Sequence, residues 1–193
     1  MTQMTEQQTT TATERATAWF GALEAALTAQ DVAAAADLFA TESYWRDLVA
    51  FSWNLTTVEH REGVSELLES TARATAARSF ALSEEATEED GVITAWFTFE
   101  TAVGRGRGLA RLVTEDGEDR AWTFLTTLYE LKGHEEPRGE YRPKGAEHGV
   151  DPQRLSWKEK REAEDAAMGV STQPYVLVVG GGQGGIALGA RLR

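Results

Sequence analysis

A run of glycines near the C-terminal end of the chain carries the clearest chemical pattern. Gly180, Gly182 and Gly185 have the spacing G-x-G-x-x-G and follow the apolar run Tyr175–Val179. In this pattern the first glycine allows a tight turn, the second lets the backbone approach a pyrophosphate, and the third lets a helix pack against the preceding strand. We therefore predict a dinucleotide site whose cofactor-binding residues are Gly180, Gly182, Gln183, Gly184 and Gly185. The alternative is a glycine-rich surface loop.

The acidic residue that would bind the ribose is expected about 20 residues after this motif, beyond Arg193. One strand and one helix cannot form a sheet, because a βαβ unit needs about 30 residues or more. We therefore expect residues 171–193 to be the truncated start of a Rossmann-type FAD- or NAD(P)-binding domain.

Asp47 is the candidate catalytic residue. In the segment 44–53 apolar and polar residues alternate, which is typical of a strand or hairpin. This alternation places Asp47 on an apolar face, where a carboxylate has a raised pKa and can act as an acid or a base. The alternatives are an ion pair with an arginine such as Arg46 or Arg61, or an outward position at a bulge. We predict a pocket whose walls are Trp45, Phe51, Trp53 and Trp96.

These residues need helices and strands to position them. Helical spacing of apolar residues predicts a helix from Ala16 to Leu27, a short helix from Asp31 (its N-cap) to Phe39, and a helix over residues 59–71. Alternation predicts strands at 44–53, 78–86, 91–103, 108–114 and 120–131. Asp-Gly turns near residues 90 and 116 predict hairpins. The order indicates an α+β domain in which a curved antiparallel sheet wraps around helices like a cone.

Composition changes suggest the domain boundaries. We predict a disordered tail at 1–13, the α+β domain at 14–132, a polar linker at 133–170 and the dinucleotide segment at 171–193. Within the linker, residues 156–168 are predicted to form a polar helix. Ser156 and Glu159 have the spacing of a capping box for this helix.

The glycine run G-G-G-Q-G-G-I-A-L-G-A-R-L resembles the flavin fingerprint of bacterial flavin-containing monooxygenases of the Baeyer–Villiger type. The upstream segments E-S-Y-W-R-D-L-V-A-F-S-W-N and L-K-G-H-E-E-P-R-G resemble a subset that carries a nuclear-transport-factor-2-like (SnoaL-like) N-terminal domain. The resemblance covers about residues 14–193. It implies FAD, NADPH as hydride donor, and oxygen transfer from O2 to a small organic substrate. The NADPH and oxygenation sites would lie beyond Arg193, so the chain alone is expected to be inactive and to hold no cofactor.

The alternative is a stand-alone module that binds a small molecule or dimerises, with a lyase or isomerase activity through Asp47 as a further alternative. By analogy we expect a homodimer through the sheet, and a first domain that packs on a flavin domain. The net charge of −12 disfavours nucleic acid as a partner. The chain has no cysteine, no metal-ligand spacing, and no apolar run long enough to span a membrane, so we expect a cytoplasmic protein without a metal.

Overall fold

The structure is a computed structural model that describes residues 10–142, 155–173 and 176–192. The chain divides into two compact units, residues 1–142 and 143–193, and each is described by itself. The domain predicted at 14–132 falls within the first unit. No helix in the described ranges is long and apolar enough to cross a membrane.

The described part of the first unit has three α-helices: α1 (Ala12–Ala29), α2 (Val32–Asp37) and α3 (His60–Thr75). Helix α1 starts inside the segment predicted as a tail, because Thr11 and Glu14 form a capping box. Asp31 caps α2 as predicted, with its side chain accepting a hydrogen bond from the Ala34 N–H. Helix α2 ends earlier than predicted, because Phe39 begins the first strand.

Seven strands form one sheet: β1 (Phe39–Leu48), β2 (Leu55–Glu59), β3 (Arg78–Leu82), β4 (Thr87–Glu89), β5 (Val92–Glu100), β6 (Gly104–Glu115) and β7 (Glu118–Leu131). Their order is β2-β1-β7-β6-β5-β3, and β4 also pairs with β5. The predicted hairpins at Asp90-Gly91 and Asp116-Gly117 are confirmed, and all four turn residues have positive φ. A short 3-10 helix, η1 (Gly139–Tyr141), follows the sheet.

The sheet is mixed, which corrects the prediction of an antiparallel sheet. Strand β1 runs parallel to β7, while the other neighbouring pairs are antiparallel. Alternation along a strand shows which side chains share a face, but it carries no information about which strand lies alongside. The first strand also ends at Leu48, and β2 was not predicted.

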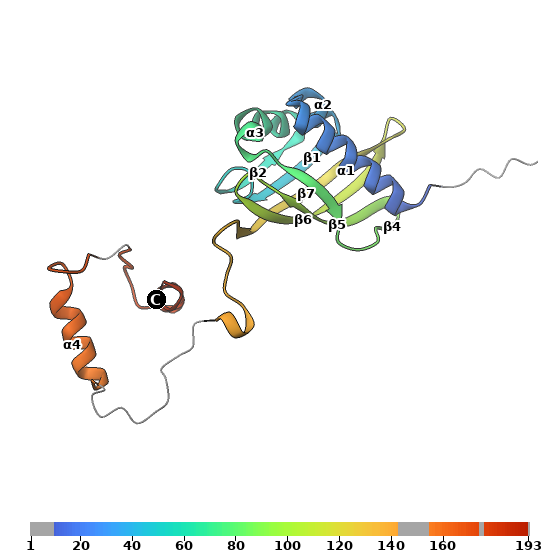
Figure 1. The fold of residues 1–193 in the computed structure, drawn as a ribbon. Helices are drawn as coiled ribbons and strands as arrows, with labels where there is room; N and C mark the ends of the chain where they lie inside the picture. Colours follow the sequence, from blue (N-terminus) through green and yellow to red (C-terminus); the bar gives the residue numbers. More distant parts are fainter. Residues whose placement is uncertain (1–9, 143–154, 174–175, 193) are drawn as a thin grey trace, which may run out of the picture. The chain divides into compact units, whose positions relative to one another are not determined.

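The helices α1, α2 and α3 all lie on one face of the sheet, here called the inner face (Figure 1). In this part of the chain no described helix covers the opposite, outer face (Figure 1). Alternation through the strand register assigns to the outer face Tyr44, Arg46, Leu48, Val92, Thr94, Trp96, Thr98, Arg105, Arg107, Leu109, Arg111, Val113, Thr123, Leu125 and Thr127.

The inner face is packed with aromatic rings. Phe97 contacts Phe20, Phe80, Phe99 and Phe124 at ring-centroid distances of 4.6, 6.0, 5.8 and 5.1 Å. The rings of Phe97 and Phe99 lie directly over β6, where the facing residues are glycines. A Cβ on Gly108 would lie 2.1 Å from the Leu125 carbonyl oxygen and 2.4 Å from the Phe97 ring. Glycine therefore allows large rings to fill this core.

The second unit contains α4 (Trp157–Ala167) and α5 (Gln183–Arg191). Helix α4 and its capping box agree with the prediction for residues 156–168. The predicted strand Tyr175–Val179 is not found, because residues 176–179 belong to no strand and Tyr175 lies outside the described residues. An isolated strand gains no ladder hydrogen bonds, and the described residues of this unit offer it no partner strand.

Candidate functional site

Asp47 is fully buried at the end of β1 and its carboxylate is saturated with hydrogen bonds. It accepts from the backbone N–H groups of Ala50, Phe51 and Ser52 at distances of 2.8 to 3.2 Å. The Ser52 hydroxyl donates to it at 2.6 Å and the Thr126 hydroxyl at 2.7 Å. This carboxylate therefore holds the turn after β1 in place.

The turn that Asp47 holds explains why the predicted alternation stops. Val49 and Trp53 both have positive φ, at 58° and 55°, a conformation that extended strands do not contain. Phe51 consequently folds back into the core with 3% exposure, whereas Trp53 is 62% exposed. The prediction that both share the face of Asp47 is wrong, since the backbone leaves the strand at Leu48.

A buried polar chain extends from this turn into the sheet. The Trp45 indole N–H donates to the Thr126 hydroxyl at 2.8 Å, and that hydroxyl donates to Asp47. No arginine in the described residues pairs with Asp47. Neither of the predicted alternatives for Asp47 describes this arrangement. The geometry favours a structural role, and the catalytic role stays a prediction.

The predicted pocket residues do not line one cavity. Trp45 and Phe51 are 2% and 3% exposed and pack against each other in the core. Trp53 and Trp96 are 62% and 47% exposed. The pocket predicted between sheet and helices is therefore occupied by side chains, and Trp96 faces the other way.

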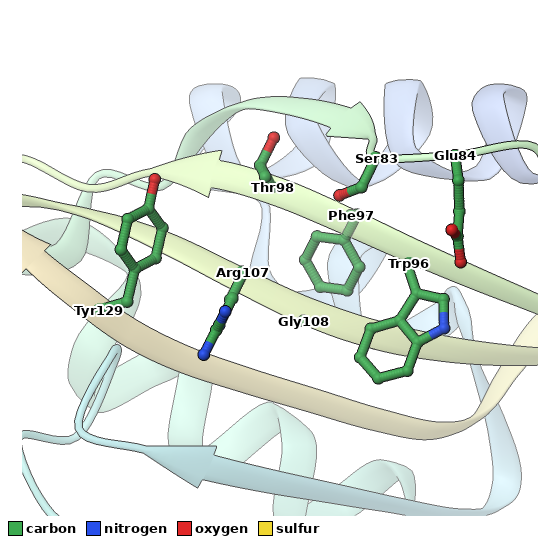
Figure 2. A pocket seen from close by; sticks show the side chains of 8 residues that line it. All are labelled: Ser83, Glu84, Trp96, Phe97, Thr98, Arg107, Gly108 and Tyr129. Atoms are coloured by element: carbon green, nitrogen blue, oxygen red, sulfur yellow. The ribbon is translucent and has the colours of Figure 1, made fainter.

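Trp96 lines a hollow of about 410 Å³ that also contains Arg107 and Tyr129 (Figure 2). These three side chains come from β5, β6 and β7. The remaining lining residues are Ser83, Glu84, Phe97, Thr98 and Gly108. A volume of this size lies within the range of small-molecule sites, and its mixture of aromatic and a few polar groups is also typical of them.

The electrostatics of this hollow centre on Arg107. Its guanidinium lies 5.8 Å from the centroid of the Tyr129 ring, a cation–π arrangement. Thr98 and Thr127 are its cross-strand neighbours. Among the described residues it forms no ion pair.

A second hollow, of about 480 Å³, lies at the other end of the same strands. Its apolar lining comes from Ala40, Val92, Val113 and Trp122, and Thr41, Glu42, Thr114 and Glu115 complete it. The Thr41 hydroxyl and then the Thr41 N–H, both donating to Glu115, lower the pKa of that carboxyl. The Glu115 carboxylate is therefore already engaged by hydrogen bonds from Thr41.

The predicted dinucleotide turn has the local geometry of a tight bend into a helix. Gly180 has φ of +106°, and Gly182 is the N-cap of α5. A Cβ on Gly185 would lie 2.1 Å from the Gly180 carbonyl oxygen, so only glycine fits there. Gln183 and Gly184 lie in the first turn of the helix. Binding of FAD or NADPH stays a prediction, and the described residues contain no cluster suited to a metal.

No family model matches the chain, and no curated protein sequence matches it. A structure from Xanthomonas campestris, described as a candidate calcium/calmodulin dependent protein kinase II association domain, aligns with a TM-score of 0.50 and 16% identity, over 60% of this chain and 86% of that one. An ntf2-like protein with a cystatin-like fold from Novosphingobium aromaticivorans reaches 0.48 at 14% identity, over 60% and 80%. A ketosteroid isomerase-like protein from Erwinia carotovora atroseptica reaches 0.49 at 12%, over 60% and 95%.

At these identities the likeness concerns the fold alone. The first of these structures, together with the architecture of residues 10–142, supports the predicted α+β cone with a curved sheet, although the sheet is mixed and not antiparallel as predicted. None of the three comparisons supports a flavin monooxygenase or a Rossmann segment.

Sequence reasoning missed the importance of Arg107 and Tyr129. A signal was available in β6, where R-G-R-G-L-A-R places arginines on one face and small residues on the other. The hollow itself depends on three strands and the loop after β3, which sequence spacing does not bring together.

Proposed function

We propose that residues 10–142 form a small-molecule-binding module that works through the outer face of its sheet. The observation that carries this proposal is the difference between the two faces of the sheet in how fully side chains fill them. Aromatic rings fill the inner face, while Trp96 and Tyr129 stand 47% and 44% exposed around a hollow on the other side. Exposed aromatic side chains beside a few polar groups are typical of ligand sites.

A catalytic role at the inner face is less well supported. A general acid or base must reach the proton that it transfers, through a direct hydrogen bond or one water molecule. Five donor groups already surround the carboxylate of Asp47, and its side chain has no exposed surface. The module is therefore proposed to bind rather than to catalyse.

Nuclear magnetic resonance can test this proposal through the tryptophan indole N–H signals. Trp96 lies in the hollow, while the Trp45 indole is buried and bonded to Thr126. A set of small planar compounds, added at about 5 mM to detect weak binding, should shift the Trp96 signal and leave that of Trp45 unchanged. Trp96→Phe identifies the signal.

Two results would contradict the proposal that residues 10–142 bind small molecules through the outer face. One is the absence of any shift with every compound. The other is a largest shift at Trp45, which would mean that the interior opens to ligand and the inner face is the functional one.

Pairing of two copies is a second candidate, favoured by the apolar hollow around Trp122. Two chains of net charge −12 repel each other, so they can meet only where the surface is locally not acidic. The outer-face residues of β5, β6 and β7 from Val92 to Thr98, Arg107 to Val113 and Thr123 to Thr127 include no carboxylate, and the two that line the hollow, Glu42 and Glu115, belong to β1 and to the last position of β6. A two-fold pairing of this face with itself would be consistent with this charge pattern.

Light scattering after size-exclusion chromatography tests the pairing. Trp122→Glu should convert a dimer into a monomer. Trp157→Glu makes the same change at a more exposed tryptophan on α4, 76% exposed against 38% for Trp122, and is the control that should leave the mass unchanged. A wild-type monomer at all concentrations rejects this candidate.

Nucleotide binding at the glycine turn is a third candidate, favoured by the close contact between Gly185 and the Gly180 carbonyl. If the turn binds a pyrophosphate, titration with FAD should shift the backbone amide signals of residues 180–185. Gly185→Ala should abolish the shift, whereas Gly189→Ala, with open space around the added Cβ, should not. Unchanged signals in the wild-type chain would contradict the prediction.

A further inference from the structure

The hollow lined by Trp96, Arg107 and Tyr129 has opposite charges at its two ends. Arg107 and Glu84 both line it, and Trp96 lies beside Glu84 (Figure 2). Tyr129 and Thr98 stand at the Arg107 end (Figure 2). A ligand that fills the hollow therefore meets a cation at one end, a carboxylate at the other, and an exposed indole.

The charge of Arg107 is available to a ligand. Other arginines of the first unit are engaged by carboxylates: Arg15 pairs with Asp119 and Glu88, and Arg61 with Asp37. Arg107 contacts the Tyr129 ring instead, which orients the guanidinium without neutralising it. A planar guanidinium with free N–H groups is well suited to bind a carboxylate through two parallel hydrogen bonds.

Arg111 serves as a comparison for Arg107, because it is on the same strand and has similar neighbours but lies outside the hollow. It lies four residues further along the same strand and points to the same face, about 13 Å away at the usual rise of a strand. Its cross-strand neighbours Thr94 and Thr123 match the Thr98 and Thr127 that flank Arg107. Arg111 does not line the hollow and has no aromatic contact among the described residues. The two arginines therefore differ mainly in the hollow and in Tyr129.

We propose that the hollow binds a planar aromatic carboxylate that carries an N–H donor at the far side of its ring system. This inference rests on the proposed binding function and names its ligand class. The carboxylate pairs with Arg107, the ring packs on the Trp96 indole, and the donor faces Glu84. Hydroxyl groups of Ser83 and Thr98 line the same hollow and offer further polar contacts.

Larger anions fit these observations less well. A phosphate polymer would bring several negative charges to a hollow that is lined by one cation, and it would meet Glu84 in the hollow itself. The chain as a whole carries a net charge of −12. A single small anion avoids this repulsion because only one end of it is charged.

Isothermal titration calorimetry on the full chain tests the ligand class with three related probes. Indole-3-acetate has the carboxylate and the N–H donor, indole-3-acetamide lacks the charge, and 1-methylindole-3-acetate lacks the donor. We expect indole-3-acetate to bind at least about tenfold more tightly than the amide, since hydrogen bonds to charged groups contribute about twice as much as neutral ones. The methylated probe should bind several-fold more weakly than indole-3-acetate.

Variants assign these preferences to residues. Arg107→Gln should weaken indole-3-acetate binding by about 10- to 100-fold and leave the amide nearly unaffected. Arg111→Gln makes the same change in net charge on the same strand and should alter binding by less than about twofold. Glu84→Gln should remove the discrimination against the methylated probe. Tyr129→Leu, which removes a positioning residue, should lower the acid-to-amide preference more than the amide affinity.

Equal binding of the acid and the amide, or equal losses in Arg107→Gln and Arg111→Gln, would overturn the proposal. These results would leave the binding module intact, because the probes would still shift Trp96. Failure of every planar compound to bind would reject the module itself. Circular dichroism melts of the two arginine variants confirm that both remain folded.

Discussion

The two faces of the same sheet differ in how completely their side chains are satisfied. On the inner face, aromatic rings pack on one another and Asp47 accepts hydrogen bonds from five different groups. On the outer face, Trp96 is half exposed and Arg107 has no carboxylate partner among the described residues. Side chains that are already packed and hydrogen-bonded contribute to the stability of the fold. Exposed rings and charges without a partner can instead form new contacts with a ligand.

This contrast also separates residues of similar chemistry. Trp45 and Trp96 are both strand tryptophans, yet the first is bonded within the core and the second borders a hollow. Substitutions on the inner face should therefore affect mainly the free energy of unfolding, and those on the outer face mainly binding. The following changes test that division, from the largest expected effect to the smallest.

Gly108→Ala should be the most damaging substitution. The added Cβ would meet the Leu125 backbone carbonyl and the Phe97 ring, neither of which can move without disturbing the sheet. Overpacking of this kind costs about 1–3 kcal/mol or more, and we expect the upper end in urea unfolding. Gly21→Ala in α1, with open space around the new Cβ, should be neutral or stabilising. Equal unfolding midpoints for the two variants would show that the inner face is packed loosely enough to accept the added Cβ.

Asp47→Asn should lower the free energy of unfolding by about 2–3 kcal/mol, because the amide replaces an acceptor with a donor among N–H and O–H groups. The matched control is Asp116→Asn, in an exposed hairpin turn where asparagine also accepts positive φ. Thermal melts of both variants give the comparison. A small change in Asp47→Asn would instead support the predicted catalytic role, since the carboxylate would not be required for folding.

Trp96→Thr should change stability by less than about 0.5 kcal/mol, as usual for an exposed position, and threonine suits a strand. The same variant should lose most of the binding of planar compounds. A clear loss of stability would mean that the indole packs against its own chain and that the two faces differ less than proposed. Chemical unfolding and calorimetry on one preparation measure both effects.

The smallest expected effect is the contribution of Glu115 to stability at acidic pH. Because the hydrogen bonds from Thr41 lower the pKa of Glu115 in the folded chain, folding favours its ionised form. Its contribution to stability is complete above the ordinary pKa of about 4.3 and is lost as the pH falls through the lower folded value. Glu115→Gln should therefore flatten the fall in melting temperature between about pH 4.5 and pH 3. An unchanged slope would show that the Glu115 carboxylate contributes nothing measurable to stability.

The amino-acid sequence by itself determined much of the local structure. Helical spacing and capping residues located α1, α3 and α4, and Asp-Gly turns located both hairpins, because these signals involve residues close together in the chain. Alternation also predicted strands over β5 and over part of β6.

Tertiary structure alone decided the arrangement that matters for function. The parallel pairing of β1 with β7 joins residues about 80 positions apart, and it brings Thr126 to Asp47. The alternation through Trp53 failed as a guide, because hydrogen bonds to that carboxylate fold the backbone into a turn. The hollow needs Glu84, Trp96, Arg107 and Tyr129 together, and only the register of several strands places them there.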